Sequence, residues 1–209
     1  MKGKFITLEG IEGAGKSTAI VILNKLLNQK NISFINTREP GGGPNGKKIR
    51  DLLLDSKNNI NSSTELLLMF ADRSDHVESL IIPNLQAGIW VISDRYVDSS
   101  IAYQGGGRGL NQNMIDNLAK SMSFPVPDLT LLFDLSVDIA LERAANRSEL
   151  DRFEVEDYDF HQRIRSTYLD LAINNKTRIK IIDSSKDKKK VQELCSNELL
   201  KFLSDEGYN

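Results

Sequence analysis

One segment near the N-terminus constrains the fold of this chain more than any other. Residues 10–17 read GIEGAGKS, which fits the pattern G-x-x-x-x-G-K-[S/T]. The apolar run Phe5–Leu8 precedes it and a helical pattern begins at Lys16, which is the strand–loop–helix context that the pattern requires. The glycines let backbone N–H groups turn inward around phosphate oxygens, at the positive end of the helix. The segment therefore predicts a phosphate site in an α/β fold.

Short apolar runs and longer helical patterns alternate along the chain. Five apolar runs, typical of parallel strands buried on both faces, lie at residues 5–8, 33–37, 89–93, 129–133 and 179–182. Helical spacing predicts helices from residue 16 and at residues 64–85, 111–122, 137–145, 154–171 and 188–203. Ser62 or Ser63 is expected to cap the helix over 64–85. The alternation indicates one three-layer α/β domain over residues 1–209, with a parallel sheet between helices.

Composition and charge exclude several classes of function. The 209 residues carry 27 Lys+Arg and 29 Asp+Glu, for a net charge of −2, which excludes a generally basic nucleic-acid surface. The longest uncharged run, 79–93, is interrupted by Pro83 and Gly88, so no membrane span is expected. No secretory signal is expected from the N-terminal residues, and Cys195, the single cysteine, indicates a reducing compartment. We expect a cytoplasmic protein that binds neither nucleic acid nor membrane.

Two residues of the glycine-rich segment carry its chemistry. Lys16 is expected to reach the β- and γ-phosphates of a nucleotide, and the Ser17 hydroxyl to ligate Mg²⁺. An accidental glycine-rich turn is the alternative, and the strand before the segment and the helix after it argue against that. The segment leaves the phosphoryl acceptor open. The residues expected to surround the nucleotide are Gly10, Ile11, Glu12, Gly13, Ala14, Gly15, Lys16, Ser17 and Thr18.

Polar clusters follow the second and third predicted strands. They read TREPGG at 37–42 and SDRY at 93–96. In an open parallel sheet, ligands bind beyond the carboxyl ends of the strands. Asp94 is placed to hold Mg²⁺ directly or through water, and Arg95 to fork onto a phosphate. A surface ion pair is the alternative for these two residues, but they are expected at the same sheet edge as the glycine-rich loop.

Further polar residues indicate a function only when they are considered together. Singly, Arg50 and Arg73 would be expected to face solvent and Tyr103 to pack in the core. Together with the segments above, they resemble the bacterial thymidylate kinase family over nearly the whole chain. The segments at 37–42 and 98–105 are the specific ones, because many nucleotide-binding enzymes share the glycine-rich loop. The other matching segments are 10–17, 67–73, 94–96 and 149–152.

The resemblance implies a phosphotransferase that moves the γ-phosphoryl of ATP to dTMP. The products would be dTDP and ADP, within dTTP synthesis, and Mg²⁺ would accompany ATP as the cofactor. It also implies a P-loop kinase fold with sheet order 2-3-1-4-5, a mobile lid over about residues 143–153, and a homodimer. The catalytic residues it implies are Lys16, Arg95 and Arg147.

The resemblance also assigns the acceptor site. Glu12 would accept a hydrogen bond from the 3′-hydroxyl, although a solvated loop acid is the plainer interpretation. Tyr103 would crowd the ribose 2′ position and so disfavour ribonucleotides, which is a steric rejection. The residues expected at the acceptor phosphate are Arg38, Arg50 and Arg95. Those expected at the thymine edge are Arg73, Ser100 and Gln104.

The chain departs from the family at two places. Many members stack the base on a Phe where this chain has Met69; we assign that role to Phe70, with a plain core residue as the alternative. Some members carry an Arg in the phosphate loop where this chain has Gly13. The positive charge that this Arg would supply is therefore expected from the lid. Arg143, Arg147 and Arg152 bracket that lid, and Ala145 replaces a further lid arginine. Arg143 is expected against the adenine ring, and a salt bridge that holds the lid is the alternative for Arg152.

The acceptor phosphate removes the need for a strong base, because its second pKa is about 6 and it is already an oxyanion. Catalysis then becomes positioning and charge neutralisation, and His76 and His161 are expected to be structural. Other P-loop kinases remain alternatives, as does an inactive binding paralogue, which the intact Lys16 and Asp94 disfavour. A GTP-binding switch is disfavoured because the sequence has no N-K-x-D tetrapeptide and no D-x-x-G after its third predicted strand.

Overall fold

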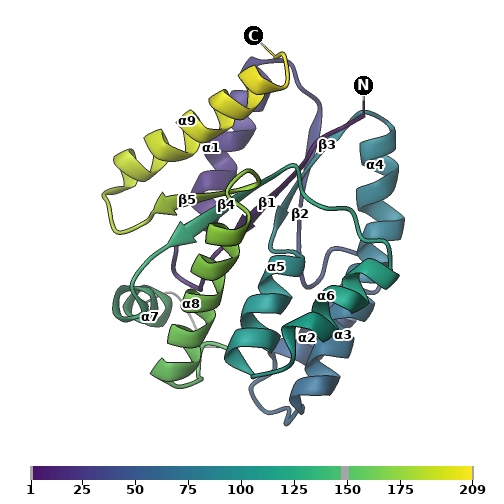
Figure 1. The fold of residues 1–209 in the computed structure, drawn as a ribbon, viewed down its shortest axis with the longest axis vertical. Coiled ribbons are helices and arrows are strands. Elements are labelled where there is room, and N and C mark those ends of the chain that lie inside the picture. The colour runs from purple at the N-terminus through teal and green to yellow at the C-terminus, as the bar shows by residue number, and fades with distance from the viewer. Residues whose placement is uncertain (1, 147–150, 209) are drawn as a thin grey trace.

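The computed structural model describes residues 2–146 and 151–208. Its centre is a parallel five-stranded sheet in the order β2-β3-β1-β4-β5, which confirms the predicted order (Figure 1). Each strand lies within one or two residues of its predicted position. The strands are β1 (Phe5–Glu9), β2 (Phe34–Arg38), β3 (Trp90–Asp94), β4 (Leu129–Asp134) and β5 (Ile179–Asp183).

Helices connect the strands, and some stretches are π-helical (η). The predicted helix at 64–85 is a continuous run of α3, η1 and α4, and Asn61 caps it instead of Ser62 or Ser63: its side chain accepts from the Thr64 N–H at 2.9 Å. The predicted helix at 154–171 begins later, at Tyr158, because Asp157 caps it. The helices are α1 (Lys16–Gln29), α2 (Gly46–Leu54), α3 (Ser62–His76), η1 (Val77–Ile81), α4 (Ile82–Gln86), α5 (Val97–Ser100), η2 (Ile101–Gly107), α6 (Gln112–Ser121), α7 (Val137–Ala145), α8 (Tyr158–Asn174) and α9 (Lys188–Asp205).

Strand residues alternate between two hydrophobic layers. Ile6 and Leu8 of β1 face the helices α1 and α9, where Leu23 and Leu199 are fully buried. Phe5, on the opposite face, packs against η1 and α4, and farther along this face α8 covers β4. Figure 1 shows α1 and α9 side by side on one side of the sheet. The predicted three-layer architecture is confirmed.

The parallel strands bring their carboxyl ends to one edge of the sheet. Asp94 pairs in register with Leu8 on one side and with Arg38 on the other. The loop after β1 therefore lies beside the residues that end β2 and β3. This edge is where an open parallel sheet binds ligands.

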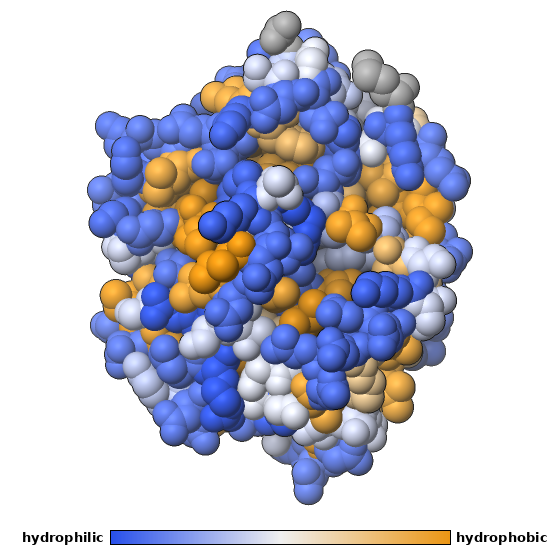
Figure 2. Space-filling view, in the orientation of Figure 1, coloured by the Kyte–Doolittle hydropathy of each residue, from blue (hydrophilic) through white to orange (hydrophobic). Residues whose placement is uncertain are grey.

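The surface of the molecule is mostly polar. Figure 2 shows one face, on which hydrophilic residues predominate and apolar residues form separate patches. Among residues 2–146 and 151–208, no helix combines the length and the apolar character needed to cross a membrane.

Candidate active site

The loop between β1 and α1 has a backbone that requires glycine. Gly10, Gly13 and Gly15 have φ of 133°, 76° and 96°, in the region that other residues rarely adopt. A Cβ on Gly10 would lie 2.5 Å from the carbonyl oxygen of Phe133, and one on Gly13 would collide with that of Ala140. Gly15 caps α1, whose first residue is Lys16. The glycine positions of the sequence pattern thus set the loop's shape at the positive end of α1.

Lys16 lies in this loop with its ammonium group buried. Its Nζ donates to the carbonyl oxygens of Gly10 at 3.1 Å and Ile11 at 3.2 Å. Burial, reinforced by the positive charge of Arg95, lowers the pKa of Lys16, while Asp94 acts in the opposite direction. A bound polyanion would add a further favourable charge for this ammonium group.

A large hollow surrounds the loop; its volume, including the space open to solvent, is about 1710 Å³. Arg143 of α7 reaches across it, and its Nη1 donates to the Ser184 carbonyl at 3.3 Å. Sequence reasoning had not included the β5–α9 side of this hollow, because residues 184–191 carry no recognisable motif. The lining residues are Glu12, Gly13, Ala14, Gly15, Lys16, Ser17, Thr18, Arg50, Asp94, Arg95, Arg143, Asn146, Asp151, Glu154, Ser184, Lys186, Lys188 and Val191.

A second, narrower cavity of about 500 Å³ adjoins the first. It brings together seven predicted acceptor-site residues that are distant in sequence, from Glu12 to Gln104. Its lining residues are Glu12, Glu39, Pro40, Arg50, Leu54, Met69, Arg73, Arg95, Ser99, Ser100, Tyr103, Gln104, Asp151 and Phe153. The residues that line both hollows are Glu12, Arg50, Arg95 and Asp151. The two hollows therefore meet at a boundary of two carboxylates and two guanidinium groups.

Arg95 is the most heavily constrained residue of this boundary. Its φ is 74°, which is uncommon for a residue other than glycine and concentrates at functional sites. Its Nη1 donates to the Gly10 carbonyl at 3.0 Å and to Ser99 Oγ at 3.2 Å. Its Nη2 forms an ion pair with Glu12. The guanidinium thus bridges the phosphate loop and α5 in a fixed orientation.

Tyr103 completes the arrangement around Glu12. Its hydroxyl donates to Glu12 and accepts from Arg95 Nη2 at 3.1 Å, and the guanidinium lies 4.9 Å from the ring centroid. The Arg95 and Lys16 charges and the Tyr103 hydroxyl outweigh burial and lower the pKa of Glu12. Burial raises the pKa of Tyr103 well above its usual range. At neutral pH Glu12 is therefore an acceptor and Tyr103 its donor.

Arg73 is held inside the narrow cavity by a buried acid. Its Nε donates to Glu39 Oε2 at 2.6 Å and its Nη1 to Ser100 Oγ at 3.0 Å, while the other Glu39 oxygen contacts His76 Nδ1 at 2.9 Å. His76 is structural, as expected: it links Glu39 to Thr37. Arg73 Nη2 donates to the Tyr96 carbonyl at 3.0 Å, so the cluster fixes a guanidinium that lines the cavity.

Phe70 does not lie in this cavity. Its ring packs against Phe124 and lies 5.0 Å from the Arg73 guanidinium, so it supports Arg73 from the protein side. Met69 and Phe153 line the cavity instead. The structure thus gives no support to our choice of Phe70 as the stacking residue. On a helix, adjacent residues point about 100° apart, so a shift of one position changes the face.

The remaining predicted arginines lie near the junction but differ in setting. Arg50 is half-buried, its Nη1 donates to the Pro40 carbonyl at 2.8 Å, and burial together with the Arg38 charge lowers its pKa. Arg38 is exposed at the end of β2 and lines neither hollow. Arg147 lies outside the described residues. Arg152 is buried and forms an ion pair with Glu65 at 2.7 Å, which agrees with the structural alternative for this residue.

Several buried acids at the site escaped sequence reasoning. Glu9, the last residue of β1, accepts from the Tyr96 N–H at 2.8 Å and from Ser99 Oγ at 2.6 Å. Burial, reinforced by Asp98, raises the pKa of Glu9 to about 7. Glu39 and Glu65 are likewise buried. Their positions within predicted loops and helix starts resemble those of solvated acids, so no local signal marks them.

The chain is similar to known proteins over most of its length. The family model described as thymidylate kinase matches residues 8–195. A thymidylate kinase of Carboxydothermus hydrogenoformans is 48% identical over 187 residues, covering 89% of this chain and 91% of that protein. One from Nitrosomonas europaea is 43% identical, with 98% and 95% covered. One from Pseudoalteromonas translucida is 45% identical, with 99% and 100% covered. With this match and the geometry above, the chain belongs to the thymidylate kinase family.

Proposed function

We propose that this protein transfers the γ-phosphoryl group of ATP to dTMP and releases dTDP and ADP. The observation that carries the proposal is the junction of two hollows at Glu12, Arg50, Arg95 and Asp151. One hollow contains a phosphate loop and the other contains side chains suited to a nucleoside monophosphate. Relatives that cover nearly the whole chain are named thymidylate kinase.

The large hollow is the proposed ATP site. Residues 10–18 would surround the phosphates, with Lys16 at the β- and γ-groups, and Arg143 would lie against the adenine ring. Mg²⁺ fits beside the exposed Ser17 hydroxyl, because Asp94 Oδ1 is buried there with no hydrogen-bond partner among the described residues. When bound, Mg²⁺ would neutralise charge on the transferred phosphoryl group. Ser17 and Asp94 would hold it, directly or through water.

The narrow cavity is the proposed dTMP site. Arg73, Ser100 and Gln104 would face the base, with Met69 in the place that we had assigned to Phe70. Glu12 would accept from the 3′-hydroxyl, and the Tyr103 ring would fill the space that a 2′-hydroxyl needs. The acceptor phosphate would bind Arg50 and Arg95 at the junction, with Arg38 nearby.

Catalysis in this proposal is positioning and charge compensation. The acceptor phosphate is an oxyanion at neutral pH, so no residue needs to remove a proton. Arg95 is fixed by the Gly10 carbonyl and by Glu12, so it would hold the attacking oxygen at the boundary between the hollows. Lys16 and Arg147 would offset the negative charge on the transferred phosphoryl group in the transition state. The lid over residues 143–153 would exclude water and limit ATP hydrolysis.

An acceptor panel tests the function. ADP release from ATP and Mg²⁺ is measured with dTMP, dUMP, dCMP, dGMP or no acceptor, and dTMP is expected to give the highest kcat/KM, with slow release when no acceptor is added. A kcat/KM for dGMP equal to that for dTMP would refute the substrate assignment.

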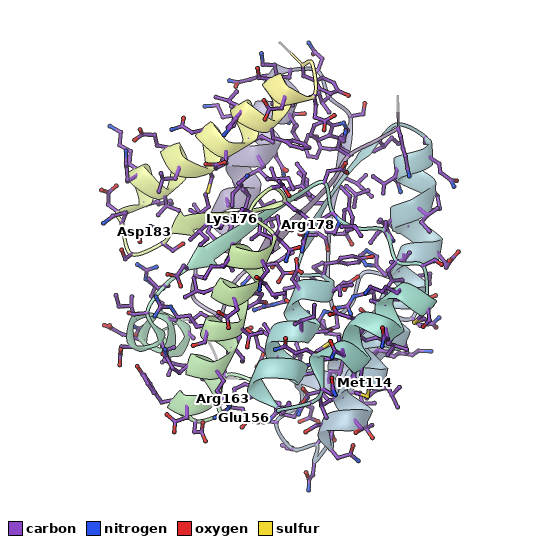
Figure 3. The ribbon with its side chains drawn as sticks, in the orientation of Figure 1. Met114, Glu156, Arg163, Lys176, Arg178 and Asp183 are labelled. Atoms are coloured by element: carbon purple, nitrogen blue, oxygen red, sulfur yellow. The ribbon has the colours of Figure 1, made fainter. Side chains whose placement is uncertain are left out.

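We also propose a homodimer in the cytoplasm. Leu67 of α3 and Met114 of α6 are large apolar side chains that are 61% and 46% exposed, and Figure 3 labels Met114. Cys195 is a free, buried thiol, which suits a reducing compartment. Light scattering coupled to size exclusion should give twice the 23.4 kDa of one chain. A monomer at micromolar concentration would contradict the dimer.

A further inference from the structure

A buried carboxylate lies directly behind the proposed base site. Glu65, in the first turn of α3, is fully buried and does not line the cavity itself. Its Oε1 accepts from Gln104 Nε2 at 2.8 Å. Its Oε2 forms ion pairs with Arg108 Nε at 3.1 Å and Arg152 Nη1 at 2.7 Å. Glu65 thus joins η2 and the segment after residue 150 to α3.

The contact between Glu65 and Gln104 fixes which end of the Gln104 amide faces the cavity. A carboxylate has acceptor oxygens only, whereas an amide has a donor end and an acceptor end. The –NH₂ group must therefore face Glu65, because the reverse orientation would place two oxygens together. Gln104 is 1% exposed and is held in its place by packing. No described group donates to its Oε1, which leaves this oxygen for a ligand in the cavity.

Arg73 supplies the complementary element of the same cavity. A guanidinium has N–H donors only, and that of Arg73 is fixed by Glu39 and Ser100. Arg73 and Gln104 therefore present a donor and an acceptor of defined position to this cavity. Thymine offers the matching edge, an O4 acceptor beside an N3–H donor. Cytosine offers the reverse, an N4 donor beside an N3 acceptor, and would place like groups opposite each other.

We propose that Glu65 is a positioning residue that sets base specificity by orienting the Gln104 amide. It holds Nε2, so that Oε1 accepts from N3–H of the base and repels a base with an acceptor at that position. This inference rests on the proposed function and extends it to a residue that does not touch the substrate. A purely structural role, in which Glu65 only neutralises Arg108 and Arg152, is the competing explanation.

The substitution Glu65→Gln separates the two explanations. A glutamine at this position offers either an oxygen or an –NH₂ group, so Gln104 is free to reverse. The ratio of kcat/KM for dTMP to that for dCMP should fall roughly 5- to 100-fold, the range for one mismatched buried hydrogen bond. Glu156→Gln is the matched control. It removes the other ion pair of Arg108, at 2.5 Å, without contacting Gln104, and should leave the ratio unchanged (Glu156 is labelled below α8 in Figure 3).

A double-mutant cycle tests whether Glu65 acts through Gln104. In a Gln104→Ala background, Glu65→Gln should produce no further change in the dTMP/dCMP ratio. The same fold-change in both backgrounds would overturn the proposal, and so would an unchanged ratio in the single variant. Wild-type protein that uses dCMP as efficiently as dTMP would instead refute the proposed function, and this inference with it.

One measurement does not depend on the variants folding. In the wild-type complex with ¹⁵N3-labelled dTMP, nuclear magnetic resonance should detect a coupling across the hydrogen bond from N3 to the ¹³Cδ of Gln104. A bound, slowly exchanging imino proton with no such coupling would overturn the proposal.

Discussion

Removal of a single hydroxyl group, by Tyr103→Phe, tests the arrangement at the junction of the two hollows. This hydroxyl donates to Glu12 and accepts from Arg95 at 3.1 Å. Hydrogen bonds to charged groups contribute about 1.5–3 kcal/mol each. Glu12 and Arg95 remain paired with each other and are 19% and 15% exposed, so water replaces part of the loss. We expect a net loss of about 1–2 kcal/mol, which lowers kcat/KM for dTMP roughly 5- to 30-fold.

The aromatic ring of Tyr103 is predicted to determine the preference for deoxyribose over ribose. It packs edge-on against Phe153, Phe160 and Tyr168, with centroid distances of 5.7, 6.4 and 6.4 Å. Tyr103→Phe keeps this ring and should therefore keep the preference for deoxyribose. Tyr103→Ala removes it, which should cost about 3–5 kcal/mol of stability and raise the relative use of ribothymidine monophosphate.

Steady-state kinetics with dTMP and ribothymidine monophosphate, together with urea unfolding, measure both effects. The reasoning predicts that the hydroxyl controls efficiency and the ring controls sugar choice. It would be refuted if Tyr103→Phe changed the deoxyribose/ribose ratio, or if Tyr103→Ala folded and left that ratio unchanged.

Further predictions concern the metal, a buried acid and the lid. Asp94→Asn should raise the Mg²⁺ concentration needed for half-maximal activity roughly 10- to 100-fold; an unchanged Mg²⁺ titration would remove Asp94 from the site. The folded-state pKa of Glu9, about 7 against an ordinary 4.5, means that the native state binds this proton more tightly, so stability falls as pH rises from 4.5 to 7. Glu9→Gln should therefore gain on the order of 3 kcal/mol relative to wild type across that window, and a constant difference between urea unfolding at pH 5 and pH 8 would contradict it. Arg147→Ala should lower kcat about 100-fold with dTMP binding by calorimetry unchanged, and a near-normal kcat would move the role to Arg143 or show that no single lid arginine dominates.

The strands and the phosphate loop were predictable from the sequence because their signals are local. A strand covered on both faces is mostly apolar, as β1 and β4 are. The glycines of the loop are required by backbone geometry alone. The order of the strands, in contrast, came from the resemblance, because pairing between strands depends on contacts distant in sequence.

Two helical stretches, α2 and the continuous run of α5 and η2, were not predicted, for reasons that lie in tertiary packing. α2 has nine residues, GKKIRDLLL, with three of its four apolar residues at its end, and the segment before it reads GGGPN. η2 reads as a glycine-rich loop, yet it packs closely on α8: a Cβ on Gly107 would lie 2.6 Å from the Phe160 ring. Glycine permits this close approach of η2 to α8, and the sequence alone does not show that α8 is the neighbouring helix.

The residues of the candidate site also divide into those that a local motif predicted and those that depend on contacts distant in sequence. Residues that a motif places at a strand end, such as Asp94 and Arg95, were predicted at the correct edge. The buried acids Glu9 and Glu65 were not, because their partners, such as Ser99 and Gln104, lie 39 or more positions away in the sequence. The choice between Met69 and Phe70 depended on the rotation of α3, which spacing to Arg73 alone does not define.

The central claim is that two nucleotides bind at once in hollows that share one boundary. An adenosine and a thymidine joined 5′ to 5′ by a chain of phosphates should occupy both hollows. Calorimetry should give one molecule bound per chain, and inhibition kinetics should be competitive with ATP and with dTMP alike. Binding that competes with only one of the two substrates, or two molecules bound per chain, would contradict the account.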